Sequence, residues 1–326
     1  MGYEPVRVPA RPDGRWIERV RTGKFELVFN LCEGVDGLPH LEPAVAATLE
    51  CMGVPFTGCP SFTLDICLRK YLVNSLLERA GLNVAPWALV RKGDKLPKIA
   101  FPAICKPAAE DASVGIDQGA VVTNRRQLKA RLEFMLERWD EILVQKFVDG
   151  REFNVGIVGD LTLPISEIDF GAMPKDKWRI ITFLSKWAPG TDEDLGAMPC
   201  CPARVTKRDA ARIVKAAQMA WRAVSGHGFG RVDMRMDSKG RPWILEVNPN
   251  PDFSPTAGLA RMGLAAGLDY TKLVGVLCDA AFARARMTPE NTERWEVSQR
   301  MAALSENGAR ANGERRSNGD AARPTN

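Results

Sequence analysis

The feature that most constrains the fold is a pair of strand-like runs joined by a short polar turn, between residues 228 and 248. The first run reads GFGRVDMRM, the connection reads DSKG, and the second run reads RPWILEVN. A short connection that ends in glycine, between two runs of alternating character, is typical of a β-hairpin. We therefore expect the two runs to be antiparallel neighbours in one sheet.

The hairpin gathers polar side chains, because side chains alternate between the two faces of a strand. Arg231 and Asp233 share one face of the first strand, and Glu246 and Asn248 share one face of the second. Since the strands are neighbours, these faces can coincide and bring an arginine, two carboxylates and an amide together. The remaining side chains fall on the opposite faces: Val232, Met234 and Met236 in the first strand, and Trp243, Leu245 and Val247 in the second.

Oxygen ligands of this kind suit Mg²⁺ bound to substrate phosphates. A solvated polar face with one chance salt bridge explains the same pattern equally well. A second motif favours phosphate binding, because Lys106 ends the apolar run FPAICK and a loop of small residues with Ser113 and Gly115 follows. A lysine beside free backbone N–H groups can hold nucleotide phosphates, although neither GxxxxGK[ST] nor GxGxxG occurs in the chain.

The composition narrows the class of protein. The chain has 326 residues, of which 45% are hydrophobic and 26% charged, as in ordinary globular proteins. The net charge of +5 comes without a basic run interleaved with aromatic residues, so we expect no nucleic-acid partner. No apolar run approaches the roughly 18 residues that span a bilayer, and residues 1–14 lack the apolar core of a secretory signal. We expect no membrane association.

The cysteine pattern gives no metal site. Eight cysteines occur without a C-x-x-C pair, and the chain has only two histidines, which disfavours zinc. Reduced thiols in a cytoplasmic protein are the simpler interpretation.

Helix and strand patterns alternate along the chain, which indicates an α/β protein with α+β character and several antiparallel hairpins. The last 22 residues, 305–326, contain no apolar side chain larger than alanine, and we expect them to be disordered. Besides the hairpin, we expect strands at 25–31, 54–58, 101–107, 141–148 and 151–169, helices at 39–53, 63–81, 125–139, 207–225 and about 270–286, and an irregular segment at 174–203.

The motifs, taken in order, resemble the D-alanine–D-alanine ligases of the ATP-grasp superfamily. FNLCEGVDG, GVPFTG, AGLNVAPW, KPAAEDASVG, GREFNVGIVG, FGRVDMRMDSKG and ILEVNPNPDFSP look like that family's blocks, spread over about three-quarters of the chain. The resemblance implies an ATP-grasp fold with a truncated N-terminal Rossmann-like domain. The implied divisions are a shortened N-terminal domain (1–62), a central subdomain (63–147), a C-terminal subdomain with the metal site (148–288) and a tail (289–326).

The resemblance also implies an ATP site with two parts. Lys70, Lys106 and Lys186 would contact the phosphates, and the loop around Ser113 would fold over them, because positive charge neutralises the transferred phosphoryl group. The nucleoside would lie in a hinge at 145–148 and beside an acid that binds the ribose hydroxyls. The residues implied there are Gln145, the backbones of Lys146 and Val148, and Glu152.

The remaining implied roles concern the metal and the chemistry. Asp233, Glu246 and Asn248 would hold two Mg²⁺ ions, with Mn²⁺ as an acceptable substitute. Arg231 would stabilise the tetrahedral oxyanion and would form the catalytic set together with Lys186 and Ser113. A carboxylate would take the γ-phosphoryl group of ATP to give an acylphosphate, and an amine would attack it to form an amide.

The chain departs from the family's pattern mainly at amino-acid recognition. Its N-terminus looks like the family's second strand, without the Gly-rich loop that precedes it. Because a site built to hydrogen-bond a substrate discriminates strongly, these changes predict substrates other than two D-alanines. The other departures are Asp111 and Ala112 in the phosphate loop, Trp187 after the mobile lysine, and Asp252, Ala257 and Gly258 in the second-substrate loop.

Two alternatives stay open. The chain could bind ATP without ligase turnover, or it could belong to another ATP-grasp branch, such as a carboxylase. In the ligase interpretation the partners are small amino-acid or carboxylate substrates, and a homodimer is compatible with the sequence.

Overall fold

The described part of the computed structural model comprises residues 2–287. The chain divides into two compact units, Met1–Ala281 and Phe282–Asn326, and helix α10 (Tyr270–Met287) crosses this division. The predicted tail at 289–326, with its predicted disordered stretch at 305–326, lies outside the described residues. The four-part domain division stays a prediction.

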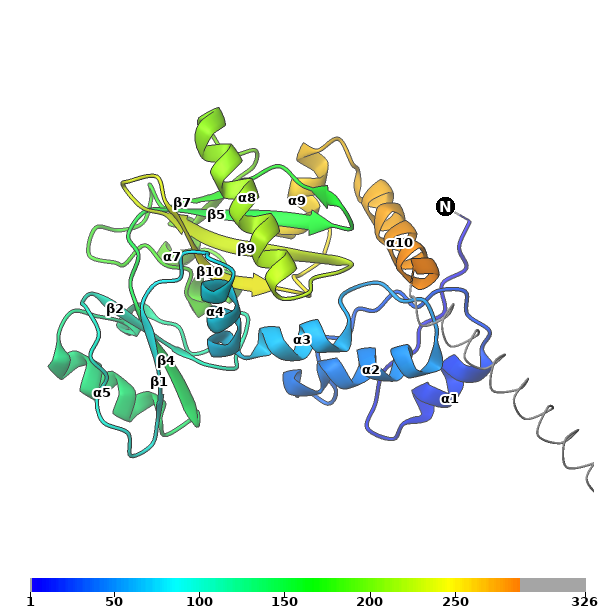
Figure 1. The fold of residues 1–326 in the computed structure, drawn as a ribbon, viewed down its shortest axis with the longest axis horizontal. Helices are drawn as coiled ribbons and strands as arrows, with labels where there is room; N and C mark the ends of the chain where they lie inside the picture. Colours follow the sequence, from blue (N-terminus) through cyan, green and yellow to red (C-terminus); the bar gives the residue numbers. More distant parts are fainter. Residues whose placement is uncertain (1, 288–326) are drawn as a thin grey trace, which may run out of the picture. The chain divides into compact units, whose positions relative to one another are not determined.

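The predicted hairpin forms, and it lies at one edge of an antiparallel sheet. The strand order is β10-β9-β5-β7-β8, with β6 paired to β5 (Figure 1). Helix α8 (Lys207–Ala223) covers one face, because Ile213, Ala217 and Trp221 recur at helical spacing and join the core of the sheet. The strands are β5 (Arg151–Val158), β6 (Leu161–Thr162), β7 (Ser166–Asp169), β8 (Met198–Cys200), β9 (Phe229–Met236) and β10 (Pro242–Asn248).

A second, smaller sheet has the order β1-β4-β2-β3, and all its pairings are antiparallel. Helix α5 (Arg125–Met135) packs on it through Leu128, Leu132 and Met135, and Asn124 caps the helix by accepting from the Gln127 backbone N–H. The predicted strands at 101–107 and 141–148 are confirmed in shorter form. The strands are β1 (Trp87–Arg91), β2 (Ala103–Pro107), β3 (Val121–Val122) and β4 (Glu141–Lys146), and a 3-10 turn, η2 (Gln118–Ala120), precedes β3.

The single helix predicted at 63–81 is wrong, since two helices occupy this stretch. Helix α3 (Ser61–Leu68) ends before Arg69, whose backbone is not helical (φ −103°, ψ 87°), and α4 (Lys70–Arg79) begins directly after it. The break frees the Lys70 backbone N–H to donate to the Ala108 carbonyl at 3.0 Å. A tertiary hydrogen bond to Ala108, just after strand β2, thus overrides the continuous helical pattern.

The N-terminal part has less strand than predicted. The runs at 25–31 and 54–58 meet only in one parallel bridge between Val28 and Phe56. The helix predicted at 39–53 is confirmed as η1 (Pro39–Leu41) followed by α2 (Glu42–Met52), and α1 (Arg15–Thr22) was not predicted. A lone pair of short runs has no further strand on which to build a ladder.

The predicted irregular segment at 174–203 contains short elements, and the chain then ends in helices. Helices α6 (Phe183–Trp187) and α7 (Asp192–Leu195) are each capped by a threonine, Thr182 and Thr191. After β10 come α9 (Gly258–Ala265) and α10, which confirms the predicted last helix.

A β-bulge sets the register of the hairpin. Ile244 pairs with Met234, but the next pair is Glu246 with Asp233, so Leu245 is an extra residue without a partner. In a regular ladder Leu245 would pair with Asp233, and Glu246 would face Val232 on the core side of the sheet. The bulge therefore moves Glu246 to the same face as Asp233.

The bulge corrects the face assignment made from simple alternation. The core face of β10 consists of Ile244 and Val247, which are three residues apart and pack in the main core. Leu245 is the bulged residue, and Trp243 pairs with Arg235. The predicted apolar face of Trp243, Leu245 and Val247 is therefore wrong for Trp243 and Leu245.

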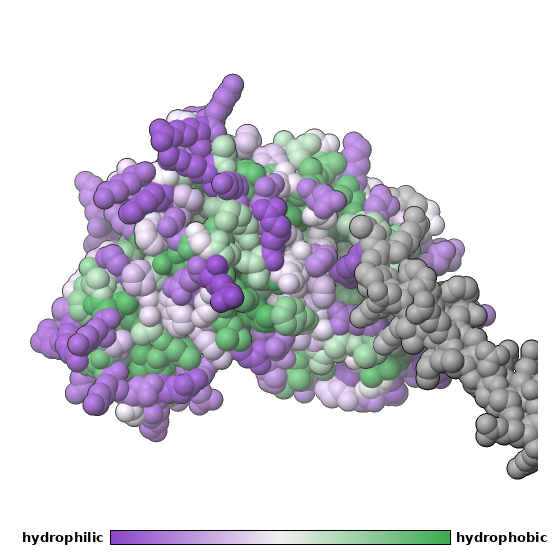
Figure 2. All heavy atoms as spheres, viewed as in Figure 1, coloured by the Kyte–Doolittle hydropathy of each residue, from purple (hydrophilic) through white to green (hydrophobic). Residues whose placement is uncertain are grey.

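The surface is mixed in character. On the face shown in Figure 2, hydrophilic side chains predominate, with apolar patches between them. Within residues 2–287, no helix combines the length and apolar character needed to cross a membrane.

We predict that Gly230→Ala destabilises the sheet that carries the polar face. A Cβ atom at Gly230 would lie 2.3 Å from the Trp221 ring and 2.9 Å from the Asn248 carbonyl oxygen. Such overpacking costs about 1–3 kcal/mol, measurable as a lower urea midpoint with an unchanged slope. Gly258→Ala is the control, because its nearest contact is 3.8 Å away, and its midpoint is expected to stay within error of the parent protein. Equal midpoints for the two variants would contradict the packing argument.

Candidate active site

One face of the large sheet carries a continuous row of polar side chains. It is continuous because the residues are paired in register: Glu152 faces Arg235, Asn154 faces Asp233, and Asp233 also faces Glu246. Four of the members were predicted from the hairpin, and the β5 acid was expected from the resemblance. The row consists of Glu152 and Asn154 on β5, Arg231, Asp233 and Arg235 on β9, and Glu246 and Asn248 on β10.

Asp233 lies at the centre of this row and is fully hydrogen-bonded. Its Oδ1 accepts from Arg231 Nε and Asn154 Nδ2, both at 2.7 Å. Its Oδ2 accepts from Arg231 Nη2 at 2.8 Å and from Asn248 Nδ2 at 2.9 Å. Asn248 Nδ2 also donates to Glu246 Oε1 at 2.9 Å. The structure thus brings Asn248 within hydrogen-bond distance of both Asp233 and Glu246.

The donor set fits a hard divalent cation. Two buried or half-buried carboxylates and one amide supply oxygen ligands, which Mg²⁺ prefers. Among residues 2–287 no group of three or more His, Cys, Asp or Glu is placed to hold a metal ion, and the set of Asp233, Glu246 and Asn248 contains two carboxylates and one amide. Arg231 occupies both oxygens of Asp233, and it would have to release one of them to an ion.

Two predicted phosphate-binding lysines flank Glu246. Lys70, at the start of α4, donates from Nζ to the Glu110 carbonyl and to Asp111 at 3.2 Å. Lys106 is buried at the end of β2 and donates to the Leu245 carbonyl, the bulged residue, at 3.4 Å. Burial lowers the pKa of Lys106 to about 8, with the Glu246 charge opposing that change.

The charge of Glu246 shows how closely these cations lie. Burial alone would raise the pKa of Glu246, but Lys70, Lys186 and Lys106 together hold it well below its usual range. The charges of all three lysines predicted to contact phosphates therefore act on one carboxylate. They favour the ionised form of the half-buried Glu246.

The predicted phosphate loop is held by a following segment. Ala112 and Ser113 have positive φ angles of 53° and 61°, and the Ser113 side chain is half-buried. Trp187 Nε1 donates to the Ala112 carbonyl at 3.2 Å, and the Phe183 backbone N–H donates to the Ile116 carbonyl at 2.9 Å. These bonds dock α6, which carries Lys186, against the loop.

The predicted adenine hinge, residues 145–148, is held by hydrogen bonds to neighbouring segments. Gln145 is buried, and its Nε2 donates to the Ala85 carbonyl at 3.3 Å. The Lys146 backbone N–H donates to the Pro86 carbonyl at 2.8 Å. The Val148 carbonyl accepts from Arg235 Nη1 at 2.9 Å. A nucleotide would therefore meet backbone groups whose positions are already fixed.

Arg235 was missed by the sequence interpretation and links several predicted residues. It is 3% exposed, pairs with Glu152 at 2.9 Å, and also donates to the Arg179 carbonyl. Its guanidinium lies 4.9 Å from the centre of the Phe147 ring. Asn154 was missed as well. Both residues follow a predicted site residue by two positions, so strand alternation could have identified them.

A carboxylate that was also missed, Glu42, lies at the start of α2. It is buried, and its Oε1 accepts from Asn250 Nδ2 at 2.8 Å. Burial raises the pKa of Glu42 to about 7, with the Asn250 hydrogen bond opposing and Asp111 and Glu33 adding to the rise. A glutamate in the first turn of a helix is ordinary, so no sequence signal marked it.

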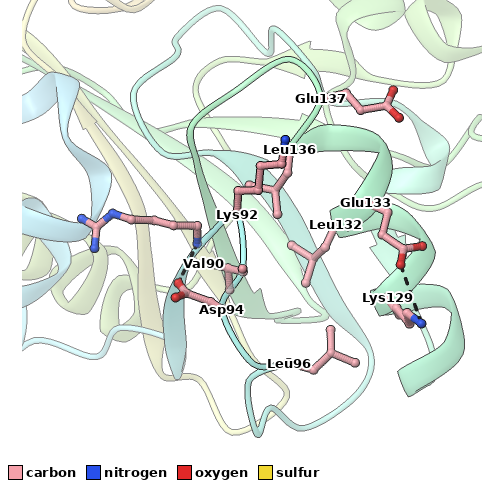
Figure 3. A pocket seen from close by; sticks show the side chains of 11 residues that line it. Val90, Lys92, Asp94, Leu96, Lys129, Leu132, Glu133, Leu136 and Glu137 are labelled. Carbon is pink, nitrogen blue, oxygen red and sulfur yellow. Dashed lines mark hydrogen bonds and ion pairs between the residues drawn. The ribbon is translucent and has the colours of Figure 1, made fainter.

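A pocket elsewhere on the molecule lacks this chemistry. It has a volume of about 460 Å³ and lies between the end of β1 and α5 (Figure 3). Its floor is apolar, with Val90, Leu96 and Leu132, and the Lys129–Glu133 pair at 3.7 Å lies at its side. None of the predicted site residues lines it, and the polar row remains the candidate active site.

Comparison with known proteins identifies the family. The family model described as the D-ala D-ala ligase C-terminus matches residues 76–279. A D-alanine–D-alanine ligase of Geotalea uraniireducens (strain Rf4) is 30% identical over 242 residues, which cover 73% of this chain and 74% of that protein. "Uncharacterized protein y4sG" of Sinorhizobium fredii (strain NBRC 101917 / NGR234) is 27% identical over 263 residues, covering 79% of this chain and 75% of that protein.

A solved structure has the same fold. The D-alanine–D-alanine ligase of Bacillus anthracis complexed with ATP superimposes with a TM-score of 0.66 at 21% identity, covering 83% of this chain and 84% of that chain. The predicted fold class is therefore confirmed. This chain belongs to the D-alanine–D-alanine ligase family and has the ATP-grasp fold.

Proposed function

We propose that the chain joins an amino-acid or other small carboxylate to an amine through an acylphosphate, with release of ADP. It is an ATP-dependent ligase that forms an amide bond, as its family membership shows. The observation that carries the proposal is the placement of Lys70 and Lys106 beside Glu246, next to the hydrogen-bonded Asp233 and Asn248. Such a concentration of cations next to oxygen ligands suits a bound triphosphate.

We assign the ATP-binding roles to residues whose positions support them. Lys70, Lys106 and Lys186 would neutralise the phosphates, and the loop with Ser113 would cover them, because Trp187 docks α6 on that loop. Gln145 and the backbones of Lys146 and Val148 would border the adenine. Glu152 would bind the ribose hydroxyls. Arg235 fixes both the Glu152 carboxylate and the Val148 carbonyl, and so orients this half of the site.

Asp233, Glu246 and Asn248 would hold Mg²⁺, or Mn²⁺ in its place, and two ions are expected. The ions, when bound, supply positive charge that offsets the charge of the phosphates. In this chain Arg231 neutralises Asp233 by two hydrogen bonds. A bound ion would supply the charge that Arg231 now provides to Asp233, and Arg231 would then be available to the reacting carbonyl group.

The proposed reaction has two balanced steps. A carboxylate oxygen attacks the γ-phosphorus of ATP, the bond to the bridging oxygen breaks, and ADP leaves. The amine then attacks the carbonyl carbon of the acylphosphate, inorganic phosphate leaves, and the new amide nitrogen loses a proton. Arg231 would stabilise the negative oxygen that develops in the second step.

The substrate side supports a pair other than two D-alanines. Asp111 forms an ion pair with Lys70, and Asp252 accepts a hydrogen bond from the Ser254 hydroxyl. The Trp187 indole N–H donates to the Ala112 carbonyl. These side chains, which depart from the family's pattern, are committed to contacts within the protein. Asp111 and Glu33 act on the buried Glu42 with their negative charge, and a negative potential on this side favours a substrate that carries an amine.

Several expectations remain proposals without a structural observation of their own. They are the homodimer, the cytoplasmic location, the absence of nucleic-acid and membrane partners, and the catalytic role of Ser113. The main alternative is ATP binding without turnover, and the first experiment below decides between the two.

We predict that ADP release from Mg-ATP requires two substrates. A panel of amino acids and small carboxylates, tested singly and in pairs, is expected to contain a pair that gives ADP and a new amide in equal amounts. The pair of two D-alanines is expected to be a poor one, because its recognition residues differ. Tight ATP binding without ADP release by any pair would instead support a nucleotide-binding protein without turnover.

We predict that Glu246→Gln abolishes turnover and leaves the fold intact. The amide keeps the size of the side chain but removes the charge that Lys70, Lys106 and Lys186 surround. A loss of at least a hundredfold in kcat with an unchanged circular dichroism spectrum is the expected result. Glu167→Gln on β7 is the control, because Glu167 pairs with Phe153, on the face of the sheet opposite to the polar row. Full activity of Glu246→Gln would refute the assignment.

We predict a pH limit from Lys106. Burial favours its neutral form, so with a pKa of about 8 the ammonium is charged below pH 8 and loses its charge as the pH rises above it. The value of kcat/KM for ATP is expected to fall about tenfold per pH unit above that point. In Lys106→Arg the charge persists, and this fall should disappear even if the absolute rate is lower. The same fall in both proteins would show that another group titrates.

A further inference from the structure

Asn74 is a buried polar residue that the proposed mechanism does not use. It lies on α4, one helical turn after Lys70, and is 3% exposed. Its Nδ2 makes no hydrogen bond, and among the described residues only Arg131 Nε shares this condition of burial without a partner. An unpaired buried donor destabilises a protein, so native structures keep few of them.

The amide of Asn74 borders a small pocket of the candidate active site. The cavity measures about 10 Å³ for the centre of a water molecule, which is room for about one water. It lies between α4 and the bulged part of β10, and its polar lining is Asn74, Lys70, Glu246 and Asp111. Its apolar lining consists of Cys67, Val73, Leu245 and Val247.

The chemistry of this lining selects the occupant. A phosphate or other anion is disfavoured by the carboxylates of Glu246 and Asp111, and a cation is disfavoured by the Asn74 N–H groups and the Lys70 ammonium. A water molecule can accept a hydrogen bond from Asn74 and donate one to a carboxylate, and it needs only two to four polar partners. The cavity volume admits one such molecule.

A second hydrogen bond would fix the orientation of the Glu246 carboxylate. Among the described residues, its one side-chain hydrogen bond comes from Asn248 Nδ2, to Oε1 at 2.9 Å. A carboxylate held by one bond keeps rotational freedom about its side-chain torsions. A donor on the α4 side would remove that freedom.

We propose that Asn74 is a positioning residue of the ligase site. It donates to one water molecule in this pocket, and that water donates to the Glu246 carboxylate and fixes its orientation. The inference rests on the proposed function of Glu246 as a metal ligand. The alternative is that Asn74 has a purely structural place in the core between α4 and β10.

Four variants separate a positioning role of Asn74 from a purely structural one. They are Asn74→Leu, Asn74→Ala and Asn74→Ser, with Ser75→Ala as a matched control. Ser75 is exposed on the same helix, and its Oγ only bonds back to the Tyr71 carbonyl. Three quantities are measured: the thermal midpoint of the metal-free protein, Mn²⁺ binding in the presence of a non-hydrolysable ATP analogue, and the Mg²⁺ concentration for half-maximal ADP release.

Asn74→Leu is expected to keep or raise the thermal midpoint, because it removes the unpaired donor. It is also expected to weaken Mn²⁺ binding and to raise the half-maximal Mg²⁺ concentration, each at least fivefold. Asn74→Ser retains a donor and room for water, so its Mn²⁺ binding should stay within about twofold of the parent protein. Asn74→Ala serves where the leucine variant does not fold, with the same expected loss of metal binding. Ser75→Ala should match the parent protein in all three measurements.

Metal binding by folded Asn74→Leu and Asn74→Ala equal to that of the parent would overturn the proposal and leave a structural role. Glu246→Gln, measured in parallel, tells this failure from a failure of the proposed function. If Glu246→Gln loses Mn²⁺ binding while the Asn74 variants keep it, only the inference about Asn74 is wrong. If Glu246→Gln binds Mn²⁺ and turns over normally, the metal assignment itself is wrong.

Discussion

The β-bulge at Leu245 is the constraint on which the active site depends. In a regular antiparallel ladder Glu246 would face Val232 and enter the core, and the carboxylate could not meet Asp233. The extra residue puts Glu246 opposite Asp233 and leaves the Leu245 carbonyl free to accept from Lys106. One irregularity thus sets the position of the acid and supplies a contact for Lys106, a lysine predicted to bind phosphate. Bulges commonly redirect side chains next to active sites in this way.

The site also depends on internal pairing of buried charges, which water cannot stabilise there. Arg231 neutralises Asp233, Arg235 neutralises Glu152, and Lys70 is held by Asp111. Removing one partner of such a pair is costly, because it leaves an uncompensated buried charge. Under the proposed function, metal ions and phosphates would take the place of existing partners, and the protein alone keeps these groups paired. Lys106 is buried, and this burial lowers its pKa to about 8 although the charge of Glu246 opposes the change.

Sequence patterns predicted the parts of the site that follow from local periodicity. Alternation in the hairpin placed Arg231 with Asp233 and Glu246 with Asn248, and the same rule applied to β5 and β9 would have added Asn154 and Arg235. It could not predict the bulge, because nothing in PWILEV distinguishes an extra residue from a regular one. The break at Arg69 was equally hidden, since the apolar pattern of 63–81 is continuous and a hydrogen bond to Ala108 decides the local geometry. Long-range contacts, rather than propensities, determine both features.

The contrast between strands and loops explains why residue roles are easier to predict for the nucleotide than for the two substrates. The proposed metal and nucleotide groups are mostly on strands, whose hydrogen-bonded ladders fix each side chain to its neighbour. The residues on the substrate side, among them Asp111, Asp252 and Glu42, lie on loops or at the start of a helix, where one substitution changes the contacts without disturbing a sheet. Because this loop-borne side depends on few structural partners, it can accept new substrates while the strands keep the chemistry of ATP. Family membership therefore constrains the reaction more tightly than it constrains the two molecules that are joined.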